Sequence, residues 1–407
     1  MGISFFYNNS EDISLSALKV INLKKELVKN LTFNGDNTIP TLSKETGYSI
    51  PTVTKLVGEL IEENIISDFG KIDTTTGGRR PNIYGINPHA FYYLGVEVRR
   101  KSISIGLQSA DNKTVKITED INYQLENNKD SLMKLCDIIN KFVADSEVPR
   151  NKIVGACINL TGRVNSFDGF SYSYFYFDEK PLTSIIESQI NIRTYIENDS
   201  RAMAFGESNS GVVKNEKNIL FINISWGLGM GIICDGKLYY GKSGYSGELG
   251  HIPMFTNEIL CHCGKKGCLE TEVSGIALER KVKKKLAAGA TSVLTKMKDL
   301  DKITLDDILS AVIEHEDMLV IEIIEEIALK LGQNLAMLIN IFNPELVIIG
   351  GTLATAYDYM ELPVQTAIKR HSLNLVNQDV KIKKSKLGTR AGIKGACYIV
   401  RNRFFNL

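Results

Sequence analysis

The sequence of 407 residues has no long apolar run. No window approaches the roughly 20 consecutive apolar residues that a membrane-spanning helix needs, so we expect no membrane partner. Residues 1–10 are aromatic and polar, unlike the charged and then apolar start of a secretory signal peptide. There is also no internal repeat that we can recognise and no low-complexity tract. These absences together predict a soluble, cytoplasmic protein.

The sequence also has almost no net charge and few cysteines. The 48 basic and 47 acidic residues leave a net charge of +1, which excludes a globally basic nucleic-acid binder but not a locally basic module. Seven cysteines in a chain of this length favour reduced thiols or a metal site over a disulfide framework. The 43% of hydrophobic residues is an ordinary globular content, and the length corresponds to roughly two or three domains.

After a tail of residues 1–13, residues 14–86 have the pattern of a small DNA-binding module. Apolar residues recur at helical spacing from Val20 to Leu31, and a second short helix follows. Ser49 is a natural N-cap for a third helix, after which two strand-like segments flank a glycine-rich turn. This order of elements is that of a winged helix-turn-helix. The third helix is expected to bury Val53, Leu56, Val57, Leu60 and Ile61.

The exposed residues of this module suit contact with DNA. Thr52, Thr54 and Lys55 lie on the outer face at the start of the third helix, the part that enters a major groove. Arg79 and Arg80 stand at the glycine-flanked tip of the hairpin and could reach a minor groove or phosphates. Because the module is nearly neutral, we expect two modules on one operator, and therefore a homo-oligomer, a dimer or tetramer. A role in protein interaction is the alternative.

From residue 87 to residue 407 the sequence pattern changes and predicts alternating strands and helices. Apolar strands are expected at Ile153–Leu160, Ile219–Ile224 and Leu346–Gly351, and a glycine-rich loop at Gly227–Gly231. The region has about twice the usual length of a domain. We therefore expect an α/β architecture with two lobes that face a cleft.

The strongest chemical signal is a group of one histidine and three cysteines. His251, Cys261, Cys263 and Cys268 provide an imidazole and three thiolates, a set that closes a tetrahedral structural Zn²⁺ site. Such a closed site leaves no open position, so the metal is expected to order the loop 251–268 without catalysing a reaction. The alternatives are a chance cluster of cysteines and competition from His262 as a ligand.

This cysteine motif resembles the zinc signature of the ROK family, whose name stands for repressors, open reading frames and sugar kinases. The resemblance extends over nearly the whole region from residue 87 to the C-terminus. It implies an actin-like, ribonuclease-H-like pair of lobes with a sugar in the cleft. The stretches that carry it are Gly247–His251, Cys261–Glu270, Glu197–Asp199, Gly227–Gly231 and Asn343–Gly351.

The same resemblance implies a set of sugar-binding residues: Asn198, Asp199, Glu248, His251 and Glu270. The set is chemically sensible, because carboxylates and an amide can bind adjacent sugar hydroxyls, each of which is both donor and acceptor. His251 could bind the metal through one ring nitrogen and a sugar hydroxyl through the other. Taken alone, Asp199 could equally be the N-cap of a helix.

In the kinases of the family, Asp199 would be the general base for the attacking hydroxyl. The stretch that should form the first phosphate loop carries Glu97 in place of an aspartate, and Arg99 and Arg100 in place of two glycines. Long side chains obstruct the close backbone approach that cradles phosphate, and we expect the hairpin to lose the necessary turn geometry. Leu228 also replaces the usual threonine of the second loop. We therefore expect no enzyme activity.

These observations predict a sugar-responsive, DNA-binding transcriptional regulator, a repressor of genes for carbohydrate use. A sugar or sugar phosphate would be its effector, operator DNA its partner and Zn²⁺ its structural cofactor. The main alternative is an ATP-dependent sugar kinase with an appended DNA-binding domain. A third interpretation is a protein-interaction scaffold with a vestigial sugar fold.

Overall fold

The structure of the protein is a computed structural model that describes residues 14–71 and 81–407. Within these residues no helix is both long and apolar enough to cross a membrane. The chain forms two compact units. The first comprises Met1–Ile158, Tyr174–Ile196 and Ala396–Leu407, and the second comprises Asn159–Ser173 and Glu197–Gly395.

The N-terminal part of the first unit has the elements expected of a winged helix-turn-helix. Ser14 and Ser49 cap the first and third helices by accepting hydrogen bonds from the backbone N–H groups of Ala17 and Thr52. The sheet has the strand order β1-β3-β2. The elements are α1 (Leu15–Asn34), β1 (Asn37–Thr38), α2 (Ile39–Thr46), α3 (Ile50–Glu62), β2 (Ile66–Lys71) and β3 (Asn82–Ile86).

Two residues of the expected apolar faces lie outside the core of this module. Val20 is 40% exposed and Ile61 is half-buried, whereas the other residues predicted for these faces are buried. Val20 lies on the same face of α1 as Lys24, but it precedes Leu23, the first described side chain of the helix that is buried. Lys24 itself is buried, with its ammonium group 2.8 Å from Glu59 and 2.7 Å from Glu63.

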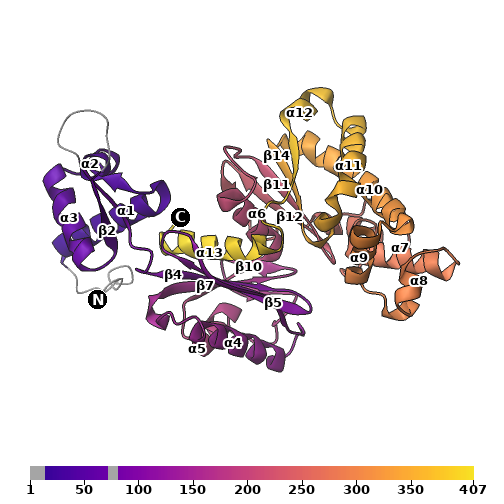
Figure 1. Ribbon diagram of the computed structural model, residues 1–407, viewed down its shortest axis with the longest axis horizontal. Helices are drawn as coiled ribbons and strands as arrows, with labels where there is room; N and C mark the ends of the chain where they lie inside the picture. The colour runs from indigo at the N-terminus through magenta and orange to yellow at the C-terminus, as the bar shows by residue number, and fades with distance from the viewer. Residues whose placement is uncertain (1–13, 72–80) are drawn as a thin grey trace. The chain divides into compact units, whose positions relative to one another are not determined.

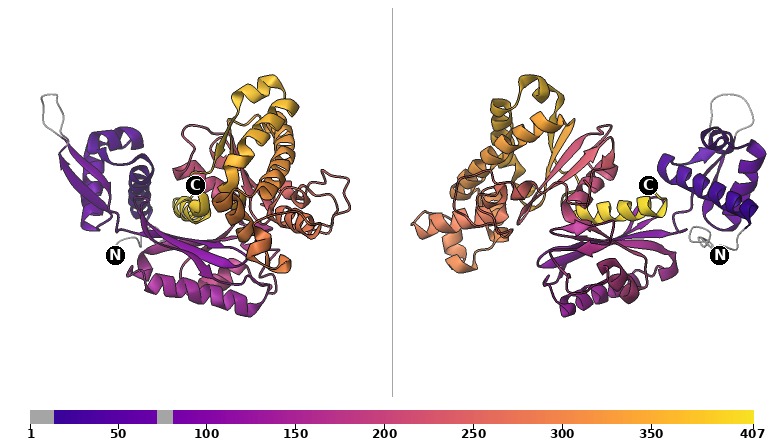
Figure 2. Two further views of the ribbon diagram at one scale, coloured as in Figure 1. Left: turned by 45° about the vertical axis from the view of Figure 1, so that its right-hand side comes forward. Right: turned by 180° about the vertical axis from the view of Figure 1, so that it is seen from behind.

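The first lobe contains a five-stranded sheet of strand order β10-β7-β4-β5-β6. Figures 1 and 2 show α4 and α5 on one face of this sheet and α13 along the other. The elements are β4 (Tyr92–Val98), β5 (Ser102–Ser109), β6 (Thr114–Asn122), α4 (Lys129–Ala144), β7 (Ile153–Leu160), α5 (Leu182–Ile190), β10 (Thr194–Asn198) and α13 (Ala391–Phe404).

A second five-stranded sheet, of strand order β13-β12-β11-β14-β15, organises the second unit. Strand β12 is antiparallel to β11, and β14 and β15 continue the sheet in parallel. Alternate residues of β11 enter two different cores: Leu220 and Ile222 pack with α10 and α11, and Phe221 packs with α6. The principal elements are α6 (Asp199–Ser210), β11 (Ile219–Ile224), β12 (Leu228–Cys234), β13 (Lys237–Leu238), α10 (Met318–Phe342), β14 (Leu346–Gly350), α11 (Tyr357–His371) and β15 (Lys381–Lys384).

The two sheets repeat one topology. In each, the strands lie in the order third, second, first, fourth, fifth along the chain. This repeat confirms the expected ribonuclease-H-like, actin-like lobes, although no repeat is recognisable in the sequence. The smaller elements of the second unit are β8 (Val164–Asn165), β9 (Phe170–Ser171), α7 (Gly275–Ala287), α8 (Leu294–Met297), α9 (Leu305–His315) and α12 (Asn374–Asp379).

The prediction of a glycine-rich loop at Gly227–Gly231 is wrong in one respect, because strand β12 begins at Leu228. The glycines serve close packing against α6. A β-carbon at Gly229 would lie 2.2 Å from Ser200 Oγ, and one at Gly231 would lie 2.5 Å from Ala204 Cβ. The stretch therefore seats the first turn of α6 against the sheet.

Candidate functional site

The five residues predicted to bind sugar all belong to the second unit. In the sequence these residues form two groups, Asn198 with Asp199 and, later, Glu248 with His251 and Glu270. The start of β12 lies against members or neighbours of both groups. The backbone N–H of Leu228 donates to Glu270 Oε2 at 3.0 Å, and the neighbouring Gly229 lies against Ser200, the residue after Asp199. Glu270 and Ser200 thus lie against adjacent positions of one strand, and Asp199 directly precedes Ser200.

Asn198, and not Asp199, is the N-cap of α6. The side-chain oxygen of Asn198 accepts from the N–H groups of Ser200 and Arg201 at 3.0 and 3.2 Å, and its amide donates to Gly162 O at 3.0 Å. Asp199 is the first residue of the helix. The N-cap alternative for Asp199 is therefore wrong, since the preceding residue satisfies the free N–H groups.

Asp199 is a partly buried carboxylate at a helix N-terminus. Burial raises its pKa, and hydrogen bonds from the backbone and hydroxyl of Ser200 and from the hydroxyl of Thr161 only partly offset this rise. The Ser200 N–H lies 2.7 Å from Asp199 Oδ1. A carboxylate held this way can accept a hydrogen bond from a ligand hydroxyl.

Glu270 is a buried carboxylate with two fixed partners. Besides the Leu228 N–H, its Oε1 lies 2.9 Å from His262 Nδ1. Burial alone would raise the pKa of Glu270, but the His262 and Leu228 hydrogen bonds outweigh it and the pKa is lowered. A β-carbon at Gly227 would lie 2.5 Å from Glu270 Oε2, so glycine is required there for this carboxylate to be seated.

His262 has a partner that the sequence analysis missed. The sequence suggests His262 only as a competing metal ligand. In the structure its ring donates to Glu270, and this hydrogen bond raises the pKa of His262. The only signal in the sequence was its position between two cysteines of a motif in which Glu270 follows closely.

The four predicted metal ligands converge. The ligand atoms of His251, Cys261, Cys263 and Cys268 all lie within 4.8 Å of one another. The distance of 3.6 Å between the sulfurs of Cys263 and Cys268 is near the ~3.8 Å expected for two thiolates on one tetrahedral Zn²⁺ with Zn–S of about 2.3 Å. Three thiols and an imidazole with this spacing could hold a metal such as zinc.

His251 connects this cluster with Glu248. Its Nδ1 is 3.5 Å from Cys261 Sγ, and its Nε2 is 3.8 Å from Glu248 Oε2. One ring nitrogen therefore faces the thiols and the other faces a carboxylate. A metal bound at Nδ1 would fix the orientation of the ring and of its second nitrogen.

Arg201 is a structural centre of the site that sequence reasoning did not identify. Its guanidinium is buried and donates to Glu197 Oε1 at 2.7 Å, Gly244 O at 2.7 Å and Val164 O at 3.1 Å. It thereby joins α6 to two loops, one of which continues to Glu248. The sequence offers only opposite charges four residues apart, and the structure places Glu197 in β10 and Arg201 in the first turn of α6.

In the first unit, the guanidinium of Arg99 forms an ion pair with Glu97. Glu97 stands at the position where a family kinase would carry the carboxylate associated with the metal. Glu97 is 2% exposed, and its Oε2 lies 3.0 Å from Nη2 of Arg99, whereas Nη1 of Arg99 lies 3.3 Å from Asp120 Oδ1. The β4–β5 turn closes nevertheless, with the Arg99 N–H donating to Ser102 O at 2.9 Å. The turn is thus formed without glycine, and the Arg99 side chain pairs with carboxylates of β4 and β6.

The residues expected to contact DNA are placed in part. Thr54 and Lys55 are exposed on α3, and Thr52 is half-buried. The hydroxyl of Thr54 donates to Ile50 O at 2.8 Å, and that of Thr52 lies 2.8 Å from the capping hydroxyl of Ser49. Arg79 and Arg80 lie outside the described residues.

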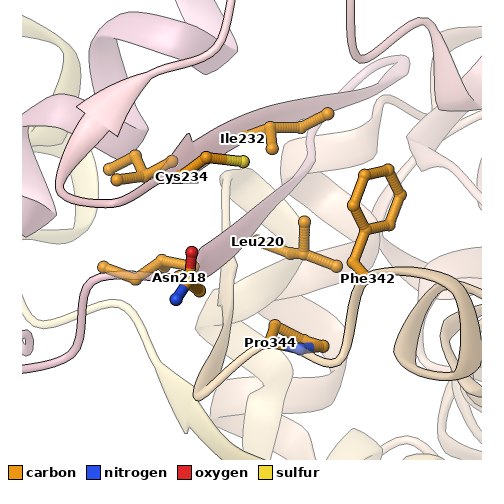
Figure 3. A pocket seen from close by; sticks show the side chains of 8 residues that line it. Asn218, Leu220, Ile232, Cys234, Phe342 and Pro344 are labelled. Carbon is orange, nitrogen blue, oxygen red and sulfur yellow. The ribbon is translucent and has the colours of Figure 1, made fainter.

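A small pocket lies elsewhere in the second unit, between β11, β12 and the end of α10 (Figure 3). None of the predicted sugar or metal residues lines it. It has no charged side chain, and its wall is largely apolar, so it offers little to a sugar. The lining residues labelled in the figure are Asn218, Leu220, Ile232, Cys234, Phe342 and Pro344.

Comparisons with known proteins show which proteins this chain is similar to. The model of the ROK family matches residues 93–403. The xylose repressor of Caldicellulosiruptor bescii is 30% identical over 386 residues, 94% of this chain and 96% of that protein. A solved ROK family transcriptional regulator, a homologue of the E. coli Mlc protein, is 28% identical with a TM-score of 0.78 and covers 96% of this chain and 98% of its own. A ROK family glucokinase from Streptomyces griseus, solved with glucose and AMPPNP, is 25% identical with a TM-score of 0.67, covering 76% of this chain and 99% of its own.

Proposed function

The chain belongs to the ROK family, and on this premise we propose that it is a sugar-responsive, DNA-binding transcriptional regulator. We take residues 14–86 as the DNA-binding module and residues 87–407 as the ROK domain. In this proposal it acts in the cytoplasm as a repressor of genes for carbohydrate use. Operator DNA is its macromolecular partner, and a sugar or sugar phosphate is its effector.

The observation that carries this proposal is the N-terminal module of the chain. Similarity to the xylose repressor and to the solved regulator spans 94% and 96% of the chain, whereas similarity to the glucokinase spans 76%. The additional part includes a helix-turn-helix whose third helix exposes Thr54 and Lys55. A sugar-binding domain joined to such a module is the composition of a regulator.

The effector site rests on the carboxylates of the second unit. Asp199, Glu248 and Glu270 offer acceptors for sugar hydroxyls, and Nε2 of His251, which faces Glu248, adds a further polar contact. Asn198 would contribute less, since capping and the bond to Gly162 use most of its side chain. A bound sugar changes operator affinity only through a different affinity for the two states of the protein.

We assign the cluster of His251, Cys261, Cys263 and Cys268 to a structural Zn²⁺. The donor set and the sulfur spacing support this assignment. Bound there, the ion would supply no reaction chemistry, because the four residues fill a tetrahedral shell. It would instead hold the loop that presents His251 and Glu270.

An enzymatic function is the less supported alternative. The glucokinase match favours it, and Asp199 occupies the position of the general base in family kinases. The ion pair of Arg99 with Glu97 opposes it, because the carboxylate is already neutralised by a cation of the chain. We therefore propose that sugar binding here serves regulation and not phosphoryl transfer.

The test is a selection of random or genomic DNA with the purified protein, followed by gel shifts with and without sugars. We expect an enriched site with two-fold symmetry and half-sites about 10 base pairs apart or a multiple of this, because a dimer presents two recognition helices. A sugar found by thermal-shift screening should change the affinity for that site. If no sequence is enriched, or the enriched site ignores every sugar that binds, the proposal fails.

A further inference from the structure

Exposed aromatic side chains gather on two loops of the second unit. Tyr172 is 48% exposed and Tyr245 is 39% exposed, and their ring centroids lie 6.1 Å apart with an interplanar angle of 74°. Beside them, Phe167 is 55% exposed and lies 5.1 Å from the ring of Tyr240. A soluble protein does not usually leave contiguous aromatic side chains in water unless the surface binds something.

Both loops lead directly into the carboxylate site. The Tyr172 N–H donates to Arg163 O at 2.9 Å, and the preceding Gly162 accepts from Asn198. On the other loop, Tyr245 precedes Glu248 by three residues. The aromatic pair therefore joins the loop next to Asn198 with the loop that carries Glu248.

Arg201 fixes these two loops together. Its guanidinium holds Val164 O of one loop and Gly244 O of the other, and it lies 5.5 Å from the ring of Tyr240. Because Arg201 is buried and paired with Glu197, this junction is rigid rather than a chance approach of two surface loops. The aromatic pair is thus built into the same framework as Asp199.

We propose that Tyr172 and Tyr245 form a second carbohydrate subsite, so that the effector is a disaccharide or longer oligosaccharide. This inference rests on the proposed function and specifies its ligand class. One sugar ring binds the carboxylates through its hydroxyls. The next ring lays its apolar C–H face on the tyrosine rings, which combine a large apolar surface with a polar hydroxyl and lose little conformational entropy on binding.

Calorimetry on the full chain tests this subsite with matched pairs of sugars. The probes are xylose and xylobiose, glucose and cellobiose, and N-acetylglucosamine and chitobiose. For at least one pair, the disaccharide is expected to bind roughly tenfold more tightly than its monosaccharide. Tyr172→Ala and Tyr245→Ala should remove this advantage and leave the affinity for the monosaccharide unchanged. Phe69→Ala, which removes an exposed aromatic ring of the N-terminal module, is the matched control.

Three results would overturn the subsite. If, in every pair in which a sugar binds, the monosaccharide binds as tightly as its disaccharide, the site ends at one ring. Variants that weaken both sugars equally would show that the tyrosines only support the carboxylate site. A change in the sedimentation of Tyr172→Ala or Tyr245→Ala would assign the surface to contact between copies of the chain. These outcomes differ from failure of the proposed function, in which no sugar of the panel binds and the subsite falls with it.

Discussion

The guanidinium of Arg401 lies 4.4 Å from the centre of the Phe33 ring. Arg401 belongs to α13 and is buried, and the ring of Tyr398 lies 4.6 Å from the same guanidinium. Phe405 adds an edge-to-face contact with Phe33 at 5.7 Å. Since Phe33 stands at the end of α1, the last turn of α13 holds the first helix of the DNA-binding module within the first unit.

Arg401→Ala should loosen this attachment. We expect the module to lose roughly 1–2 kcal/mol of unfolding free energy, the range of a desolvated cation–π contact, while sugar affinity is unchanged. Operator binding should weaken or lose part of its response to sugar. Thermal denaturation, calorimetry and gel shifts measure these three properties. Arg370→Ala, which removes an exposed arginine of α11, is the control, and equal effects of both variants would contradict a specific role for Arg401.

Substitutions in the module should separate two kinds of DNA contact. Thr54→Ala should alter which operator sequence is preferred, because it lies on the outer face of α3, and Thr52→Ala should do so if its side chain reaches a base edge. Lys55→Ala, Arg79→Ala and Arg80→Ala should weaken binding to all sequences and flatten its salt dependence. Selection and salt titrations distinguish the two effects. Unchanged binding in all five variants would place the DNA interface elsewhere.

Metal content can be measured directly. Protein purified without added metal should contain about one Zn²⁺ per chain, and Cys263→Ser should lose it with a lowered melting temperature. Cys234→Ser, a half-buried cysteine outside the cluster, should retain the metal. Elemental analysis and thermal denaturation decide the matter. No zinc, together with an unchanged melting curve for Cys263→Ser, would refute the assignment.

Glu248→Gln should weaken sugar binding by roughly 1–3 kcal/mol, because a hydroxyl would lose a charged acceptor. Glu248 is preferable to Glu270 for this test, since Glu270 also holds Leu228 and His262 in place. Glu258→Gln changes an exposed carboxylate of the metal loop and should bind sugar as the unmodified protein does. Calorimetry on the folded variants is the measurement. Full affinity in Glu248→Gln would mean that the sugar binds at another place.

ATP turnover should be absent. With ATP, Mg²⁺ and a sugar that demonstrably binds, no sugar phosphate should form above background, because Glu97 is already paired with Arg99 and the turn carries the long side chains of Arg99 and Arg100. Chromatographic detection of the product is the measurement. Steady turnover that disappears in Asp199→Ala would instead support the kinase alternative.

Much of the fold could be predicted from local signals in the sequence. Capping serines, helical spacing of apolar residues and apolar strands depend on a few neighbouring residues, so Ser49 and its helix are where the pattern placed them. The metal cluster could be predicted for the same reason, because Cys261, Cys263 and Cys268 are close in sequence. The prediction that Val20 is buried is wrong, since periodicity gives the face of a helix but not the point along it at which packing begins.

The sequence by itself determined the family, the order of elements and the chemistry of the ligand atoms, because these follow from residue types at short spacing. Only the tertiary structure decided the partners of those atoms. It pairs His262 with Glu270 and Arg99 with Glu97, and it lets Arg201 donate hydrogen bonds to carbonyl groups of two loops. Such contacts depend on how loops and strands meet after folding. These partners fix the orientation of each group. The hydrogen bond between His262 and Glu270 raises the pKa of the histidine and, against the effect of burial, lowers that of the carboxylate.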